Sequence, residues 1–112
     1  YFSGASPANS WKVTKYGVVD IYIGSIPQNT SWHQVALTYS STTGTRVYVD
    51  GALSGSSPNT ANISGGNTTF SIGLSERVNM SGNIAILRWY NTALSASDVA
   101  QNFNATRSRF GI

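Results

Sequence analysis

Residues 32–51, WHQVALTYSSTTGTRVYVDG, decide the fold of this 112-residue chain. In the first part of the stretch, residues 35–39, apolar and polar side chains alternate. This period of two is typical of a β-strand, and it places Val35, Leu37 and Tyr39 on one face. We therefore expect a strand that packs these three side chains against a core.

The second half of the stretch predicts two chain reversals around another strand. Residues 40–44 have no apolar member and end in glycine, so the chain can turn there. Residues 45–49 resume the alternation, with Val47 and Val49 on one side. Asp50-Gly51 then supplies two residues that tolerate the positive φ angles of a type I′ hairpin turn. Two adjacent hairpins make a β-meander.

Composition indicates one small β-domain with a polar but weakly charged surface. Ser, Thr and Asn make up about a third of the chain, and only 11 residues are charged. The net charge of +3 comes from scattered side chains. Nucleic-acid binding needs a stripe of basic side chains that contacts the phosphates. The sequence has no such cluster, so nucleic acid is disfavoured as a partner. There is no cysteine for disulfides or thiolate metal sites, and no apolar run approaches the roughly 20 residues of a membrane span.

The alternation outside the central stretch predicts further strands at residues 11–16, 18–23, 52–53, 70–74 and 84–90. Residues 84–90 are apolar on both faces, so we expect both faces to be covered. Residues 54–69 are rich in Gly, Ser and Asn and predict a long loop. Four large aromatic residues are expected in the core: Trp32, Phe70, Trp89 and Phe103.

Residues 94–105 are the one helix that the sequence predicts. Ser95 has the side chain of an N-cap, and Asp98 three residues later completes a capping box. Val99 and Phe103 are four residues apart, so they share one helix face and are expected to dock it onto the sheet.

Two motifs resemble the laminin-G-like, or concanavalin A-like lectin/glucanase, family. One is WHQVALTY followed by a polar loop and RVYVDG, and the other is GNIAILRWYNTALSASDV at residues 82–99. The resemblance implies an all-β fold: an antiparallel two-sheet β-sandwich of the jelly-roll type with one short C-terminal helix. Residues 1–112 would form a single domain that lacks the family's first strands. We therefore expect neighbouring copies or a larger parent chain to cover the exposed sheet.

The acidic residues argue against catalysis. Glycan hydrolases of this fold carry carboxylates at alternating positions of one strand, because one group donates a proton while another attacks or stabilises. This chain has four acids, no two within five positions: Asp20, Asp50, Glu76 and Asp98. His33, the one histidine, has no sequence partner that would mark a triad, and we assign it a structural role. The prediction is a protein that is not an enzyme.

No cofactor is predicted either. Relatives that bind calcium often have acidic residues where this chain has Ala85 and Ile86. Calcium prefers six to eight oxygen ligands, several of them from carboxylates. A weak calcium site at Asp20, or at Glu76 with Asn79, is the alternative.

Sugar binding by aromatic stacking and side-chain hydrogen bonds is the site hypothesis. The predicted ligand-binding residues are Tyr48, Asn59, Asn67, Glu76, Arg77 and Asn79, with Trp11 and Tyr22 as further stacking candidates. The alternative is that these aromatic rings serve cross-strand packing.

The function that follows is a non-catalytic carbohydrate-binding or adhesion module displayed outside a cell or on a virion. Its partner would be a glycan or a surface protein. The main alternative is a structural virion module, such as a phage capsid decoration or tail-fibre unit, which needs no small ligand. A third reading is the remnant of a glycan hydrolase whose acids lie upstream.

Overall fold

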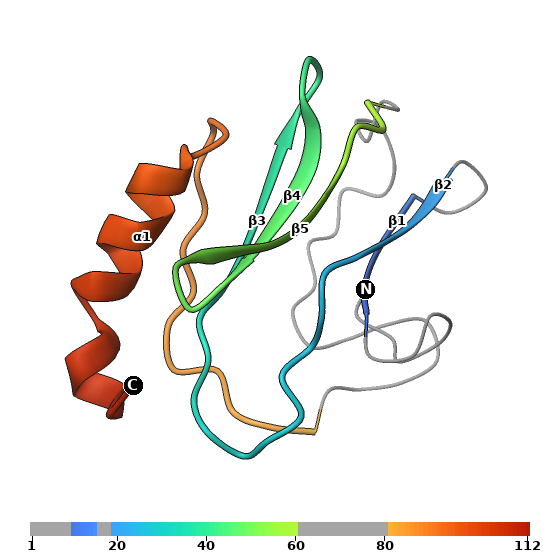
Figure 1. Cartoon of the computed structure of the whole chain (residues 1–112). Coiled ribbons are helices and arrows are strands. Elements are labelled where there is room, and N and C mark those ends of the chain that lie inside the picture. Colours follow the sequence, from blue (N-terminus) through green and yellow to red (C-terminus); the bar gives the residue numbers. More distant parts are fainter. Residues whose placement is uncertain (1–9, 16–18, 61–80) are drawn as a thin grey trace.

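The structure, a computed structural model, describes residues 10–15, 19–60 and 81–112 (Figure 1). Its strands form two antiparallel sheets, and one short α-helix follows near the C-terminus, so the predicted all-β class is confirmed. The two-stranded sheet consists of β1 (Trp11–Lys15) and β2 (Val19–Ile23). The three-stranded sheet, in the order β3-β4-β5, consists of β3 (Val35–Ser40), β4 (Gly44–Val49) and β5 (Ala52–Ser57).

The predicted meander is confirmed in its strands and its turn. Val35 lies opposite Val49, and the β3–β4 ladder continues to Ser40 opposite Gly44. Asp50 and Gly51 have φ angles of 51° and 78°. Both are positive, as a type I′ turn requires, so the Asp-Gly pair makes the reversal into β5.

The two sheets enclose a small apolar core between them. Its buried members are Trp11, Ile21, Ile23 and Val47, with Val13, Ile26 and Val49 packed against them. Ile21 and Ile23 lie on one face of β2 because strand side chains alternate, and their β1 partners, Val13 and Trp11, share that face. Val47 closes the core from β4 and is fully buried. This arrangement is a small two-layer β-sandwich.

One close approach joins the sheets at the end of β2. A Cβ atom on Gly55 would lie 2.4 Å from the backbone nitrogen of Gly24, so only glycine fits there. Beside it, the backbone N–H of Ser25 donates to the Ser54 hydroxyl at 3.0 Å. The register between β4 and β5 shifts next to this hydroxyl. The irregularity therefore sits where β5 meets the other sheet.

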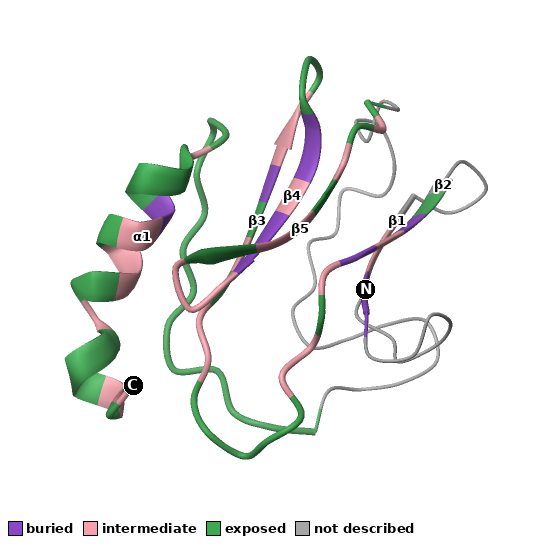
Figure 2. Ribbon diagram, in the orientation of Figure 1, coloured by how far each residue is buried: buried purple, intermediate pink, exposed green. Residues whose placement is uncertain are grey.

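The β3 side chains correct one expectation. Val35 and Leu37 are 37% and 49% exposed, although alternation places them on the same sheet face as buried Val47 (Figure 2). Alternation in the sequence predicts which side chains share a sheet face, but it does not predict whether a second layer covers that face. Among the described strands, β3 lies at one edge of its sheet, and β2 lies against β5 at the other edge. The described part of the second layer therefore covers β4 more completely than β3.

The predicted boundary between β5 and the loop that follows it also changes. β5 extends to Ser57, so the loop predicted from residue 54 begins later. Ser and Gly have weak strand propensity, but pairing with β4 overrides it. The strand predicted at residues 70–74 and most of the predicted loop lie outside the described residues.

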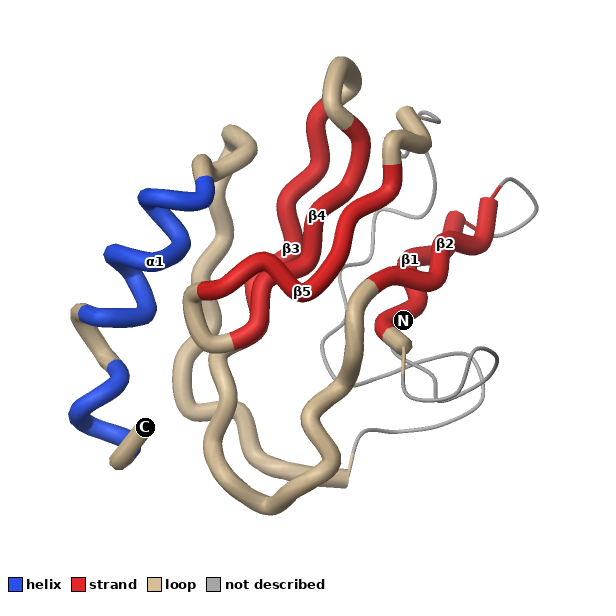
Figure 3. The backbone as a smooth tube through the Cα atoms, viewed as in Figure 1, coloured by secondary structure: helices blue, strands red, loops and turns tan. Residues whose placement is uncertain are grey.

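Residues 84–90 depart furthest from expectation. We predicted a strand covered on both faces, whereas these residues form no strand and are all exposed (Figure 3). A strand exists only where a neighbouring strand completes its hydrogen bonds. Within the described ranges no strand pairs with this segment. The prediction of a covered strand is therefore wrong for this structure, and so is the core placement of Trp89, which is 77% exposed.

The helix prediction is confirmed in detail. α1 spans Ala96–Asn104, Ser95 is its N-cap, and Asp98 completes a capping box. Val99 is 1% exposed, and Phe103 lies within about 3 Å of where a Cβ on Gly51 would be, so the helix docks beside the start of β5. A short 3-10 helix, η1 (Arg107–Phe110), follows and was not predicted. In the parts of the chain that the structure describes, no helix is both long and apolar enough to cross a membrane.

Candidate functional site: a polar pocket beside Trp32

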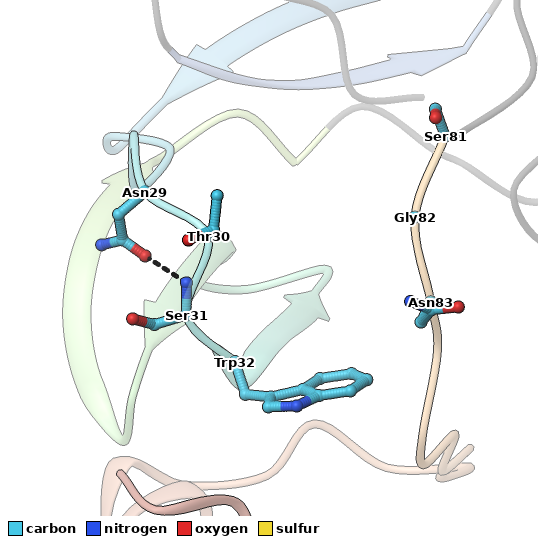
Figure 4. Close-up of a pocket in the computed structure, with 7 residues that line it drawn as sticks. All are labelled: Asn29, Thr30, Ser31, Trp32, Ser81, Gly82 and Asn83. Carbon is cyan, nitrogen blue, oxygen red and sulfur yellow. Dashed lines mark hydrogen bonds between the residues drawn. The ribbon is translucent and has the colours of Figure 1, made fainter.

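A pocket opens between two segments that are far apart in the sequence (Figure 4). One wall is the turn that precedes β3, and the other is the chain leading into the exposed segment at residues 84–90. Its volume is about 460 Å³. The described lining consists of Asn29, Thr30, Ser31, Trp32, Ser81, Gly82 and Asn83. None of these seven residues has a titratable side chain, so the described lining offers hydroxyls, amides and one indole.

Trp32 is the apolar element of the pocket. Its side chain is 41% exposed, and Figure 4 shows the indole projecting toward the segment that contains Gly82 and Asn83. The Phe110 ring of η1 contacts the indole, with ring centroids 5.5 Å apart and planes tilted by 47°. The expectation that Trp32 is a core residue is therefore wrong: one side is supported by Phe110, and a large part of the ring remains open to solvent.

A side-chain hydrogen bond shapes the turn that carries Trp32. The backbone N–H of Ser31 donates to Asn29 Oδ1 at 2.9 Å, which closes an Asx turn immediately before the tryptophan. Asn is suited to this position because its short side chain reaches the backbone two residues on. Within the described chain, the hydroxyls of Thr30 and Ser31 and the side chain of Asn83 make no hydrogen bond, so they are available to a ligand.

The same turn is tied to the β4–β5 turn through His33. One ring nitrogen, Nε2, lies 2.8 Å from Asn29 Oδ1, and the other, Nδ1, lies 2.7 Å from Asp50 Oδ2. Asp50 Oδ1 also accepts from the backbone N–H of Gln34 at 2.9 Å. These contacts give the Trp-His pair its physical role, because the histidine anchors the turn that presents the tryptophan.

Two of the predicted ligand-binding residues, Tyr48 and Asn59, are described by the structure, and neither lines this pocket. Tyr48 is only 3% exposed, so its ring faces are not open to a sugar. Its ring serves packing, which was the alternative to sugar stacking. Asn59 is half-buried at the end of β5, where its backbone N–H donates to Ser57 Oγ at 3.3 Å. The remaining four, Asn67, Glu76, Arg77 and Asn79, lie outside the described residues.

The two further stacking candidates also sit elsewhere. Trp11 is buried in the core, and its indole N–H donates to the Ser25 carbonyl at 2.9 Å. Tyr22 is half-buried, and the Lys12 ammonium lies 5.6 Å from its ring centroid. The pocket residues were missed because exposure of an aromatic side chain depends on tertiary packing. The Asn-Thr-Ser-Trp order, which permits an Asx turn before an aromatic residue, was the available signal.

The three described acids each have a local structural partner. Asp20 pairs with Lys12 Nζ at 2.8 Å, and the hydrogen bond to Asp20 raises the pKa of the Lys12 ammonium. Asp98 accepts from the hydroxyl and the backbone N–H of Ser95, and these bonds lower the pKa of its carboxyl group. Asp50 faces His33. Among the described residues, no three His, Cys, Asp or Glu side chains cluster as metal ligands would.

Comparison with known proteins agrees with this two-layer β-sandwich. Residues 1–100 match the sequence profile of the concanavalin A-like lectin/glucanases superfamily. The chain belongs to this superfamily, as the two sequence motifs implied. No curated protein sequence gives a significant match.

A solved structure supports the fold. The chain is similar to the crystal structure of an S-layer domain-containing protein, residues 221–444, from Clostridium thermocellum, with a TM-score of 0.53 and 24% sequence identity. The match covers 84% of this chain and 50% of that one, so the chain spans about half the length of its structural relative.

Proposed function

We propose that this chain is a non-catalytic module that binds uncharged glycans in the pocket beside Trp32, on the outside of a cell or virion. The observation that carries the proposal is the half-open indole of Trp32 among hydroxyl and amide side chains. Sugar rings have apolar C–H faces that stack on aromatic rings, while their hydroxyls need polar partners. The pocket volume of about 460 Å³ lies within the range of roughly 300 to 1,000 Å³ usual for small-ligand sites.

The absence of charged side chains from the described lining favours a neutral ligand. Acidic sugars are normally held by arginine or lysine, because a buried anion needs a charged partner. The described lining contributes no such side chain. Membership of a lectin superfamily supports glycan recognition and extracellular display as the setting for this chemistry.

We propose further that the module neither cuts its ligand nor needs a metal ion. Asp20, Asp50 and Asp98 are engaged by Lys12, His33 and the helix cap, and none of them lines the pocket. A glycosidase needs two carboxyl groups facing one bond. Binding should therefore be unchanged by a chelator, whereas a calcium-dependent lectin would lose it.

The test is an array of neutral and acidic glycans, followed by titration calorimetry with each hit. Replacing Trp32 with Ala should weaken binding at least about tenfold, as truncating a central aromatic side chain typically does. Trp89→Ala is the matched control, because Trp89 is 77% exposed but does not line the pocket. Equal loss in both variants, or no glycan signal for the wild-type chain, would contradict the proposal.

A second candidate function is structural assembly, favoured by the exposed apolar side chains. Leu37, Ile84, Ile86 and Leu87 are 40% to 56% exposed. In this alternative the chain packs against neighbouring copies or its parent chain, as a capsid-decoration or tail-fibre unit would, without a small ligand. Sedimentation of the isolated chain across a concentration series separates the two. Concentration-dependent oligomers that Leu87→Ser disperses, with an empty glycan array, would favour assembly.

A further inference from the structure

The ring of His33 lies between two oxygen atoms, one beside each ring nitrogen. Asp50 Oδ2, 2.7 Å from Nδ1, belongs to a carboxylate, which only accepts hydrogen bonds when ionised. Asn29 Oδ1, 2.8 Å from Nε2, is a carbonyl oxygen and also only accepts. Each contact is a hydrogen bond only if the ring nitrogen carries a proton. Both bonds exist together only in the imidazolium form, because a neutral imidazole has a single N–H.

The orientation of the Asn29 amide is fixed independently. The backbone N–H of Ser31 points at the same atom, at 2.9 Å, and an N–H needs an oxygen there rather than the amide NH₂. Asn29 Oδ1 therefore accepts from the Ser31 backbone and from the His33 ring at once. Asp50 is the charged group that contacts the ring in the described chain, and it also accepts from the Gln34 N–H.

We propose that His33 is a positioning residue whose second proton locks the turn that presents Trp32. When the ring holds one proton, the N–H remains on Nδ1, where it faces the ionised carboxylate, and the Nε2 lone pair faces Asn29 Oδ1. The two acceptors repel, and the amide relieves the repulsion by rotating so that its NH₂ donates to Nε2. The Ser31 N–H then loses its acceptor, and the Asx turn before Trp32 opens.

The consequence for the pocket follows from the order of the chain. Asn29, Ser31 and Trp32 all line the pocket, so one proton on His33 changes three lining residues together. Glycan binding should be tighter in acid than in base. This last step depends on the proposed function, whereas the coupling of the ring to the turn does not.

The experiment follows ring, backbone and indole in one NMR titration of the wild-type chain. Long-range ¹H–¹⁵N spectra report directly how many protons the His33 ring holds. The Ser31 amide and the Trp32 indole N–H, assigned with Trp32→Phe, should shift along the same curve as the second proton leaves. If the His33 ring loses that proton while the Ser31 amide and the Trp32 indole stay unchanged, the proposal is overturned. A ring that is neutral throughout the titration would overturn it as well.

Asn29→Asp is the discriminating variant. A carboxylate offers oxygen to both Ser31 and His33 and has no NH₂ to rotate into place, so Ser31 keeps its acceptor whatever the ring holds. Between about pH 6 and 9, where an ordinary aspartate stays ionised, the Ser31 and Trp32 signals of this variant should be insensitive to pH. Signals that still follow the His33 titration in this variant would overturn the role of amide rotation.

Glycan titration adds a separate readout. In the wild type, affinity should fall about two- to tenfold as the second proton leaves, which is the net worth of one hydrogen bond. Absence of any glycan binding would contradict the proposed function and leave the NMR result standing. Binding that is independent of pH while the Ser31 and Trp32 signals move would refute the coupling of the turn to the pocket.

Discussion

β4 (Gly44–Val49) and residues 84–90 are both rich in apolar and aromatic side chains. β4 is a paired strand with buried residues, whereas residues 84–90 form no strand and are exposed. β4 is the central strand of its sheet, hydrogen-bonded on both sides, with Val47 and Tyr48 buried on opposite faces. Residues 84–90 have no ladder within the described chain, and Ile84, Ile86 and Leu87 are at least 40% exposed.

The difference shows what apolar patterning leaves undetermined. Side-chain chemistry makes a stretch suitable for a strand, but a strand becomes stable only when a neighbour pairs its backbone and a second layer covers its side chains. β4 has both, since β3 and β5 are joined to it by short turns. For residues 84–90, pairing depends on segments distant in sequence, so local pattern alone cannot guarantee it.

Amide hydrogen exchange should give the largest contrast between the two stretches. The amides of Thr45 and Val47 should exchange only by global or near-global opening, which costs about 5 kcal/mol or more in a stable domain. The backbone amides of Ile84 and Ile86 donate no hydrogen bond to the described chain. They should therefore exchange with an opening free energy near zero. Equal protection in both stretches would show that the chain in solution pairs residues 84–90 with another segment.

The same substitution placed in each region tests packing rather than pairing. Ile23→Ala removes a 6% exposed core side chain and should lower the free energy of unfolding by about 2–5 kcal/mol. Ile86→Ala removes a side chain that is 40% exposed, and the loss should stay within about 1 kcal/mol. Urea denaturation followed by circular dichroism measures both. Comparable losses would mean that Ile86 is covered in solution.

The sequence predicted the parts of the fold that depend on local chemistry. The hairpin turn at Asp50-Gly51 and the capping box at Ser95 and Asp98 are each built by residues a few positions apart. The faces of β1 and β2 were also predictable, because alternation with a period of two sets which side chains meet. Exposure of Val35 and Leu37 was not, because it depends on how far the second layer reaches.

For the candidate site, the sequence indicated a type of side-chain chemistry but not a place in the fold. A composition rich in amides and hydroxyls and low in charge indicated polar recognition with an aromatic ring, and the described lining of the pocket consists of such side chains. The ring that the sequence favoured, Tyr48, is buried, while the expected core residue Trp32 is exposed. Which of two aromatic side chains faces solvent is a tertiary property, and so is the meeting of residues 29–32 with residues 81–83.

A substitution at Gly51 should have an intermediate effect on the free energy of unfolding. Gly51 lies in the turn that joins β4 to its partner strand β5. Its φ of +78° disfavours any other residue, and an added Cβ would lie 3.0 Å from Phe103 Cδ1. Gly51→Ala should cost about 1–3 kcal/mol in unfolding free energy, since it combines left-handed strain with displacement of the helix. Gly111→Ala is the control, with a φ of +70° and no atom within 4 Å of the added Cβ. If the two variants lose the same stability, the contact between the turn and α1 contributes nothing.

The smallest effect is expected where the exposed segment enters α1. Ser95 Oγ accepts from the backbone N–H of Asp98 at 3.2 Å, and the Asp98 carboxylate accepts from the Ser95 N–H at 2.9 Å. Ser95→Ala should lower the free energy of unfolding by about 1 kcal/mol, the usual cost of losing an N-cap. Thermal denaturation measures the loss. Ser97→Ala is the matched control, because Ser97 is exposed and lies two residues after the cap.

The same cap should respond to acid in a direction fixed by Asp98. Hydrogen bonds from Ser95 lower the pKa of its carboxyl group below the ordinary value of 3.8. A carboxyl group whose pKa is depressed in the folded state stabilises that state above its unfolded pKa, and the contribution disappears as the pH falls through the folded value. Wild type and Asp98→Asn should therefore differ in melting temperature near pH 6 and converge as the pH drops below about 3.8. A difference in melting temperature that stays constant across that range would show that the ionised Asp98 carboxylate is not what stabilises the cap.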